Sequence, residues 1–450
     1  MQPSYSFSSM IDSRGFRSAY AVLVMFTLIA GDAWRYTIGW WGWAALTASL
    51  AVMAVGILVR QRSHWALGRL PYPLLAFLVL ATASTAWSFY PGATALGAIT
   101  TIATVTGAVA VAVSFSWREL LQHLGTALRA ILGLSLLFEL YVSLIIRGPI
   151  LPIIPEPGYD YSNLPAKIPQ MLYWSRDQLF EVFDGGKVQG ILGNSVLLSF
   201  AALLGMIVFA LQFAGGTTRR RWSLPWFILA VAALAASRSA TIIAATVMVA
   251  VVAAAVLFVR RAGSARARTA TYGVIAAVIV VGGTLAVLLR STLFALLGKS
   301  EDLTGRLDIW AKVINLAQER PVQGWGWVSY WVPWVAPFDT LVTRNGVRQL
   351  HAHNAWIDIW FQLGIIGLIV FAVLVLSSVI RSWSFAVDRP QFAVASQSPF
   401  TVESMLPLLV LTALLVQSIA ESRLLVEFGM LFLVIVAVKT KRGESSNQGT

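Results

Sequence analysis

The sequence predicts an all-α protein that crosses a membrane many times, and three observations support that prediction. Hydrophobic residues make up 58% of the 450 residues and charged residues only 12%, roughly half the charged share of a soluble domain. The mean hydropathy is +0.74. The apolar runs are about 20 residues long, as a membrane-crossing α-helix requires, whereas strands of a membrane barrel would show short alternating segments.

Twelve such apolar segments follow one another along the chain, and each is expected to form one transmembrane helix. The polar leader before the first segment lacks a short apolar region followed by a cleavage site, so we expect no removable signal peptide. The twelve segments are 18–34, 38–59, 72–89, 93–114, 126–145, 190–213, 223–237, 239–259, 270–290, 355–380, 404–420 and 424–439.

Basic residues gather in alternate turns between these segments, whereas three short turns of the other set hold only Arg35, Arg238 and Arg423. Lys and Arg accumulate in short cytoplasmic loops, so both termini are predicted to be cytoplasmic. The net charge of +13 is then a matter of topology, and no nucleic-acid partner is expected. The chain has no cysteine, which excludes disulfides, thiolate catalysis and Cys-ligated metals.

Two outer segments are long, and they divide the chain into regions. The first is rich in proline and aromatic residues and is expected to form an irregular lid; loops of this length are often functional. The expected regions are an N-terminal five-helix membrane region (1–145), an extracytoplasmic loop (146–189), core membrane helices (190–290), an extracytoplasmic catalytic loop (291–354) and C-terminal membrane helices with a cytoplasmic tail (355–450).

The second long loop contains a stretch, 306–319, with a helical pattern that is too short to span the membrane. We expect an amphipathic helix on the outer surface or packed on the bundle, ended by Pro321. The residues expected on its apolar face are Leu307, Trp310, Ala311, Ile314 and Ala317.

Two arginines on the predicted outer side are candidates for anion binding. Arg238 lies in a hairpin between two apolar segments, where it either anchors the interface or binds an anion. Arg306 begins the amphipathic helix, at the end that disfavours cations, so it either pairs with Glu301 or Asp302 or holds a phosphate together with the helix N-terminus. Arginine suits phosphate because its planar fork donates two parallel hydrogen bonds.

Two histidines precede the tenth apolar segment. A histidine accepts protons near neutral pH, so His351 and His353 are candidate general bases, and Asp358 is a candidate to orient the ring. The alternative is an interfacial histidine without a function. His-x-His also suggests a metal, but no third ligand lies at a convincing spacing, and we predict neither a metal nor a cofactor.

Weaker candidates for substrate binding are Gln189 and Asn194 at the start of the sixth segment, and Gly324 and Gly326, which allow a tight turn. Glu421 and Arg423 lie in the last outer turn, and the simplest expectation is that they pair with each other. The sequence shows no P-loop, dinucleotide fingerprint, serine-hydrolase elbow or DxD motif.

Several short motifs occur in a fixed order along the second half of the chain. They are QGILGNS at 189–195, SRSA at 237–240, GRLDIW at 305–310, PVQGWGW at 321–327 and HNAWIDIWFQLGIIGL at 353–368. In this order they resemble the bacterial O-antigen ligase and O-antigen (Wzy-type) polymerase superfamily, over residues 187–430. One departure is Gln362, where many members carry an acid.

The resemblance implies a GT-C-like, metal-independent glycosyltransferase of the bacterial inner membrane. Its donor would be an undecaprenyl-diphosphate-linked glycan, used at the extracytoplasmic face to build exopolysaccharide or O-antigen. By motif, Arg238 and Arg306 would bind the diphosphate and His353 would be the general base. Asn354, Asp358 and Trp310 are further candidates for substrate binding. His351, which is additional to the family motif, is another, and it leaves the choice of base between the two histidines open.

Two alternatives remain open from the sequence. A ligase would move finished glycan onto a lipid or another acceptor, and a transporter or flippase would carry the lipid-linked glycan across the bilayer. A transporter is expected to place ionisable residues at mid-bilayer depth, whereas these spans are nearly free of charge. Other polysaccharide export or assembly proteins are candidate partners, beside the lipid bilayer itself.

Overall fold

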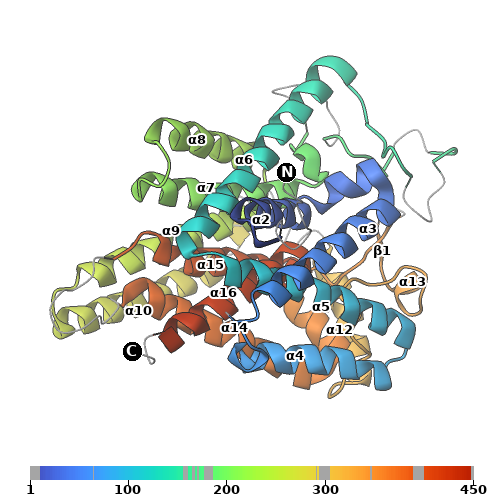
Figure 1. Ribbon diagram of the computed structural model, residues 1–450. Helices are drawn as coiled ribbons and strands as arrows, with labels where there is room; N and C mark the ends of the chain where they lie inside the picture. Colours follow the sequence, from blue (N-terminus) through green and yellow to red (C-terminus); the bar gives the residue numbers. More distant parts are fainter. Residues whose placement is uncertain are drawn as a thin grey trace, which may run out of the picture.

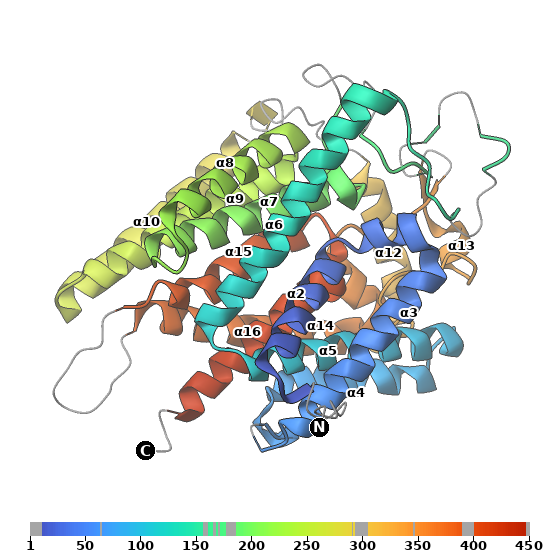
Figure 2. The ribbon, with the colours of Figure 1, turned by 45° about the horizontal axis from the view of Figure 1, so that its top comes forward.

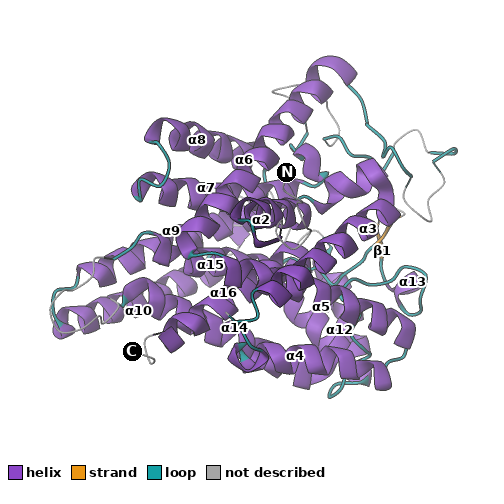
Figure 3. Cartoon of the chain, viewed as in Figure 1, coloured by secondary structure: helices purple, strands orange, loops and turns teal. Residues whose placement is uncertain are grey.

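The computed structural model describes residues 11–63, 65–155, 161–164, 168–169, 172–176, 186–289, 291–292, 305–344, 347–388 and 400–446. Regular structure in these residues is almost entirely helical (Figures 1 and 3). The exception is a two-residue antiparallel hairpin, β1 (Thr343–Arg344) and β2 (Val347–Arg348), in which Thr343 pairs with Arg348.

Thirteen α-helices of more than ten residues are described. They are α2 (Arg14–Ile29), α3 (Gly31–Arg60), α4 (Tyr72–Ala83), α5 (Pro91–Ser114), α6 (Trp117–Tyr141), α7 (Ser195–Ala214), α8 (Arg220–Ser237), α9 (Ala240–Arg261), α10 (Ala265–Leu288), α12 (Arg306–Glu319), α14 (Ala355–Val387), α15 (Leu406–Ser418) and α16 (Glu427–Ser446). Short helical turns are η1 (Leu67–Arg69), η2 (Ser84–Ala86), η3 (Val142–Ile146), η5 (Gly190–Leu192), α13 (Phe338–Leu341), η6 (Glu403–Met405) and η7 (Ser422–Leu425).

Each of the twelve predicted membrane segments overlaps one of these helices, namely α2 to α10 and α14 to α16. Within the described residues, seven helices are long and apolar enough to cross a membrane, and three shorter apolar helices accompany them. The helical class is therefore confirmed and the architecture is that of a multi-pass membrane protein. The count of twelve crossings remains a prediction.

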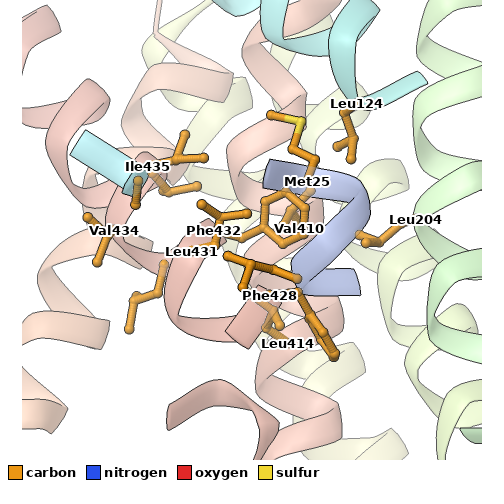
Figure 4. Close-up of a cluster of buried hydrophobic side chains, with 14 of the residues drawn as sticks. Met25, Leu124, Leu204, Val410, Leu414, Phe428, Leu431, Phe432, Val434 and Ile435 are labelled. Carbon is orange, nitrogen blue, oxygen red and sulfur yellow. The ribbon is translucent and has the colours of Figure 1, made fainter. Parts of the chain in front are cut away.

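One buried hydrophobic cluster joins the two halves of the chain. Met25 of α2, Leu124 of α6 and Leu204 of α7 lie in the same cluster as Val410 of α15 and Phe432 of α16 (Figure 4). The regions that the sequence separates thus share one core. By contrast, α8, α9 and α10 extend along one side of the molecule, away from α4, α12 and α13 (Figure 2), and the apolar window of α10 is not buried at all.

The predicted cytoplasmic turns meet at one end of the helix bundle, which we call the basic end. Arg260, in the last turn of α9, donates to the carbonyl of Ala386 at 2.7 Å and to Ser404 Oγ at 2.6 Å. Lys439 near the end of α16 donates to the carbonyl of Phe115 at 2.5 Å. The end of α9, the end of α14 and the region before α15 therefore lie together, and this arrangement agrees with the charge pattern. Which membrane face this end occupies remains a prediction.

The opposite end of the bundle, which we call the site end, carries the described parts of the two long loops. Trp87 Nε1 donates to the carbonyl of Gln323 at 3.0 Å, and the amide of Val188 donates to the carbonyl of Ala236 at 3.3 Å. Trp331, Phe338 and Phe361 form a second hydrophobic cluster there. These contacts fix the second loop against the helix ends.

The predicted amphipathic helix is confirmed as α12, with the bounds that the sequence indicated. The expected apolar face is partly wrong. Ile309, Val313 and Ala317, spaced by four residues, are the buried side chains, whereas Leu307 is 46% exposed. Because α12 packs on α14, this narrow stripe provides the contact, and Leu307 and the exposed Ala311 face away from the core.

The loop that follows α12 packs against a kink in α14. Gly364 has φ +66° inside the helix, a conformation that favours glycine. The amides of Trp325 and Gly326 donate to the carbonyls of Phe361 and Gln362, at 3.1 and 2.9 Å. A Cβ on Gly324 (φ +71°) would lie 2.5 Å from the backbone of Gln362, so only glycine allows this approach.

Candidate active site

The candidate site begins with the turn that starts α14. Asn354 caps the helix, and its side chain accepts hydrogen bonds from the amides of Trp356 and Ile357. The preceding residue, His353, has φ +51°, which is uncommon for a residue with a side chain. Such conformations persist where the surroundings impose them and are frequent at functional sites. The turn directs the imidazole toward the α15–η7 connection.

Glu421, in the connection between α15 and η7, contacts both Arg306 and His353. Its Oε1 accepts a hydrogen bond from Arg306 Nη2 at 2.8 Å, and its Oε2 lies 3.1 Å from His353 Nδ1. His351 Nε2 lies 3.8 Å from the same Oε2. The structure thus brings together three residues that the sequence predicted separately, through a carboxylate that the prediction did not place there.

The second nitrogen of His353 is also occupied. Its Nε2 lies 3.0 Å from the side-chain oxygen of Gln349. His351 lies against His353, with ring centroids 4.1 Å apart, and His351 Nδ1 accepts the backbone amide of His353 at 3.1 Å. His351 therefore supports the turn that presents His353, and His353 is the imidazole in contact with the carboxylate.

Electrostatics favour an ionised Glu421 beside a neutral His351. Burial by itself would raise the pKa of Glu421, but His353, His351 and Arg306 outweigh it and hold that pKa below its ordinary value. Burial lowers the pKa of His351 well below its ordinary value, and His353 adds to this effect. A fixed negative charge between a guanidinium and an imidazole orients both groups and stabilises an imidazolium when one forms.

The expectation that Asp358 orients the histidine ring is wrong. Asp358 is fully buried in α14, and its carboxylate accepts from Trp331 Nε1 at 3.0 Å and from the amide of Ala352 at 3.2 Å. It therefore fixes the loop before His353. Glu421 contacts the ring instead, because the chain turns between Ala352 and Ala355 and the ring faces the α15–η7 connection.

Gln362, the departure from the resemblance, holds the same loop. Its side-chain oxygen accepts the amides of Val328 and Ser329 at 2.8 and 3.1 Å, and its side-chain nitrogen donates to Asp358 at 3.0 Å. An ionised acid at this position could accept the two amides but could not donate to Asp358. The amide of Gln362 therefore makes a contact with Asp358 that an ionised acid could not make.

The aromatic and glycine candidates are also supporting residues in the structure. Trp310 Nε1 donates to the carbonyl of Ala352 at 3.1 Å, so α12 is tied to the histidine turn. Gly324 and Gly326 are buried, and a Cβ on Gly326 would lie 2.3 Å from Ser88 Oγ. These residues position the site by close packing.

Arg238 lies at the site end, apart from the Glu421 contacts. It ends α8 in the left-handed region at φ +49° and is exposed. Since the end of α9 lies beside the start of α15 and the two helices pack together, the start of α9, next to Arg238, lies toward the Glu421 end of α15. No described contact joins Arg238 to Arg306 or His353.

Gln189 and Asn194 belong to a separate arrangement around α6. The amides of Gln189 and Gly190 donate to Glu139 Oε1 at 2.9 and 2.8 Å, and Arg176 donates to Glu139 Oε2 at 2.7 Å. Asn194 caps α7 through the amides of Val196 and Leu197. Both predicted residues therefore anchor the chain before α7, close to Arg238 through the contact between Val188 and Ala236.

The expected pair between Glu421 and Arg423 is wrong. Arg423 pairs with Glu427 at 2.6 Å and donates to the hydroxyl of Tyr330. Glu427 also pairs with Arg35 of α3 at 3.0 Å, and Arg35 Nε donates to Asp32 at 2.7 Å. We call these five residues (Asp32, Arg35, Tyr330, Arg423 and Glu427) the Arg35 cluster.

One feature of the sequence points to Glu421 as a residue with a charged partner. It is an acid in an apolar hairpin, where a charge needs a partner. Residue 421 lies 68 positions after His353 and 115 after Arg306, so spacing alone could not identify the partners.

His351, His353 and Glu421 also form a group with ligand atoms within 4.8 Å of one another. These residue types suit Zn²⁺. However, a metal ion would have to replace the contact between His353 and Glu421, and its charge would lie close to Arg306, which already holds Glu421. The donor atoms are suitable ligands for a metal ion, whereas the positive charge of the neighbouring Arg306 guanidinium would repel one.

Residues 225–372 match the family model described as O-antigen ligase. The matched region, about a third of the chain, is similar to the O-antigen ligase family. The match confirms the resemblance to the O-antigen ligase and polymerase superfamily, over a narrower range than the motifs suggested. It includes Arg238, Arg306 and His353, whereas Gln189, Asn194 and Glu421 lie outside it.

A curated relative supports the same assignment over a short stretch. The chain is 30% identical over 84 residues to the exopolysaccharide production protein ExoQ of Rhizobium meliloti (strain 1021). The alignment covers 18% of this chain and 19% of that relative. The chain therefore matches about a fifth of that relative's length.

Proposed function

We propose that this protein is a glycan transferase of the bacterial inner membrane that polymerises undecaprenyl-diphosphate-linked repeat units into exopolysaccharide or O-antigen. The observation that carries the proposal is the contact of Arg306 and His353 with one carboxylate, Glu421. A cation, a fixed negative charge and a base then lie within hydrogen-bond distance at the end of an apolar bundle. The O-antigen ligase family match and the exopolysaccharide relative support the same class of reaction.

The reaction requires little beyond positioning and charge stabilisation. The acceptor hydroxyl gives its proton to His353 Nε2 and its oxygen forms a bond to the anomeric carbon of the donor sugar. The bond between that carbon and the diphosphate oxygen breaks, and the lipid diphosphate leaves with the electron pair. Attack opposite the leaving group inverts the anomeric centre. No metal is needed in this sequence of steps.

Arg306 and Arg238 are the proposed diphosphate ligands. Arg306 uses one Nη2 contact for Glu421, and a guanidinium has five N–H donors, so it can bind phosphate oxygens while it stays fixed. Arg238 is exposed at the same end of the bundle. The two cations would neutralise the leaving group, which is the usual largest contribution in such sites.

The experiment that tests this function uses purified protein in detergent, a lipid-linked oligosaccharide donor and EDTA, with products resolved on a gel. A ladder of multiples from donor alone is the expected result. Transfer only after a separate acceptor is added would establish the ligase, the alternative that the family description favours. Absence of product in both formats, with intact donor crossing the bilayer of liposomes, would overturn the proposal in favour of a transporter.

The extracytoplasmic location of the site is a separate part of the proposal. Because the chain has no cysteine, single cysteines report the side directly. Thr343 lies in the exposed hairpin at the site end and Gly263 is exposed at the basic end. A membrane-impermeant maleimide applied to intact spheroplasts should label Thr343→Cys and leave Gly263→Cys unlabelled until lysis. The reverse pattern would place the site in the cytoplasm.

A further inference from the structure

The proposed base, His353, has no open nitrogen. Its Nδ1 lies 3.1 Å from Glu421 Oε2 and its Nε2 lies 3.0 Å from the side-chain amide of Gln349. An ionised carboxylate only accepts hydrogen bonds, so Nδ1 carries the proton. The proton-accepting nitrogen is then Nε2, and Gln349 occupies its hydrogen-bonding position.

Gln349 is a suitable partner for that nitrogen. The oxygen and nitrogen of a side-chain amide are assigned from the hydrogen-bond network. With Nδ1 protonated, the Nε2 lone pair needs a donor, which the NH₂ of Gln349 supplies after exchange of the two amide atoms. The amide therefore satisfies the base in the same place where an acceptor hydroxyl must bind.

The position of Gln349 is fixed by the loop. Its side chain is only 6% exposed, and its backbone amide donates to the carbonyl of Val342 at 2.9 Å across the foot of the β1–β2 hairpin. The carbonyl of Leu350 accepts from the amide of Trp331 at 2.8 Å. Backbone contacts on both sides therefore hold Gln349 beside His353.

We propose that Gln349 is a specificity-determining residue that keeps water from the proton-accepting nitrogen of His353 until an acceptor hydroxyl takes its place. This inference rests on the proposed function. A base beside a lipid-diphosphate donor activates water as readily as a sugar hydroxyl unless water is excluded. Gln349 fills the position with a neutral donor that a bound sugar displaces.

The reaction that Gln349 prevents is hydrolysis of the donor. A water molecule at Nε2 would give its proton to His353 and form the bond from its oxygen to the anomeric carbon. The bond to the diphosphate would break, releasing free glycan and lipid diphosphate. This step needs no co-reactant other than water, and it uses the same His353, Arg306 and Glu421.

The test measures free glycan and transferred glycan in the same reaction, with the purified full chain and lipid-linked oligosaccharide. Gln349→Ala should raise the ratio of hydrolysis to transfer by about tenfold or more. Gln323→Ala is the matched control, since Gln323 is an exposed glutamine of the same loop, and its ratio should equal that of the unmodified protein. If Gln349→Ala does not fold, Gln349→Ser is measured instead.

An unchanged ratio in a folded and active Gln349 variant would overturn the inference while leaving the proposed function intact. The reverse case is also distinct. If the unmodified protein forms neither free nor transferred glycan, or if His353→Ala retains both activities, the proposed function itself fails.

Discussion

Two buried charge clusters lie on either side of η7, and they differ in what they leave accessible. In the Arg35 cluster, Arg35 and Glu427 are 5% and 7% exposed, and each cation contacts a carboxylate. Around Glu421, the side chains of Arg306 and His353 are 18% and 20% exposed. The fully paired cluster is suited to hold the chain, whereas the more open cluster is suited to bind and react.

The connection between the clusters explains why both are needed. Glu421 directly precedes η7 and Arg423 lies within it, so fixing one fixes the other. A Cβ on Gly429 would lie 2.0 Å from the carbonyl of Arg423, which shows how closely α16 approaches this turn. The Arg35 cluster is therefore the scaffold that places the Glu421 carboxylate between Arg306 and His353.

The largest expected effect comes from breaking the scaffold cluster. Glu427→Gln removes the carboxylate that pairs with both Arg35 and Arg423, and loss of one partner from a buried pair typically costs about 3–5 kcal/mol. The melting temperature in detergent should fall accordingly, while the folded fraction at low temperature keeps transferring glycan. The exposed Glu319 provides the control, Glu319→Gln. An unchanged melting temperature for Glu427→Gln would contradict the scaffold role.

Arg306→Ala should act on turnover and donor binding. Removing a charge-stabilising donor typically costs about 10²–10³-fold in rate, so kcat/KM for the donor should fall by that order in protein that is still folded at the assay temperature. Arg306→Lys should recover little because it lacks the planar fork. Arg348 of the same loop is exposed and donates to the carbonyl of Pro333, so Arg348→Ala is the control. Normal kinetics in Arg306→Ala would remove Arg306 from the site.

Glu421→Gln should lower the rate by about tenfold, since it removes the charge that stabilises an imidazolium. The pKa of Glu421 is held below its ordinary value, so the carboxylate remains ionised as pH falls from 8 toward about 5. The loss of rate in Glu421→Gln should therefore be present throughout that pH window. A Glu421→Gln protein that keeps the unmodified rate between about pH 5 and 8 would contradict the pairing.

The smallest expected effect is that of metal removal. EDTA should change the transfer rate by less than about twofold, because the proposed steps use no Lewis acid. Loss of activity in EDTA with recovery on addition of Zn²⁺ would show that His351, His353 and Glu421 hold a catalytic metal instead.

Much of the helical architecture could be predicted from the sequence because it depends on local composition. Segment length and apolar content located the helices, and the bounds of α12 followed from its periodicity. The buried stripe of α12 did not follow from its periodicity, because contact with α14 determines that Ile309, Val313 and Ala317 are the buried side chains. Periodicity describes one helix, whereas the packed face depends on its neighbour.

The sequence indicated which residue types form the candidate site, but it did not indicate which of these residues contact one another. Arg306 and His353 stood out as charged groups in a predicted outer loop. Glu421 did not, because Arg423 offered a nearer partner in sequence. In the structure, Arg35 of α3 pairs with Glu427, and Glu427 also pairs with Arg423. Arg423 is therefore held by Glu427, and Glu421 contacts Arg306 and His353 instead. A pairing decided by a helix almost 400 residues earlier cannot be seen from local sequence.

The measurement that most directly tests the central claim is single-turnover transfer by His353→Ala in the purified, metal-free assay. A positioned general base contributes about 10²–10⁴-fold, so the rate should fall by that factor while membrane insertion, melting temperature and donor binding remain those of the unmodified protein. Transfer at the unmodified rate by a stable His353→Ala protein would contradict the account.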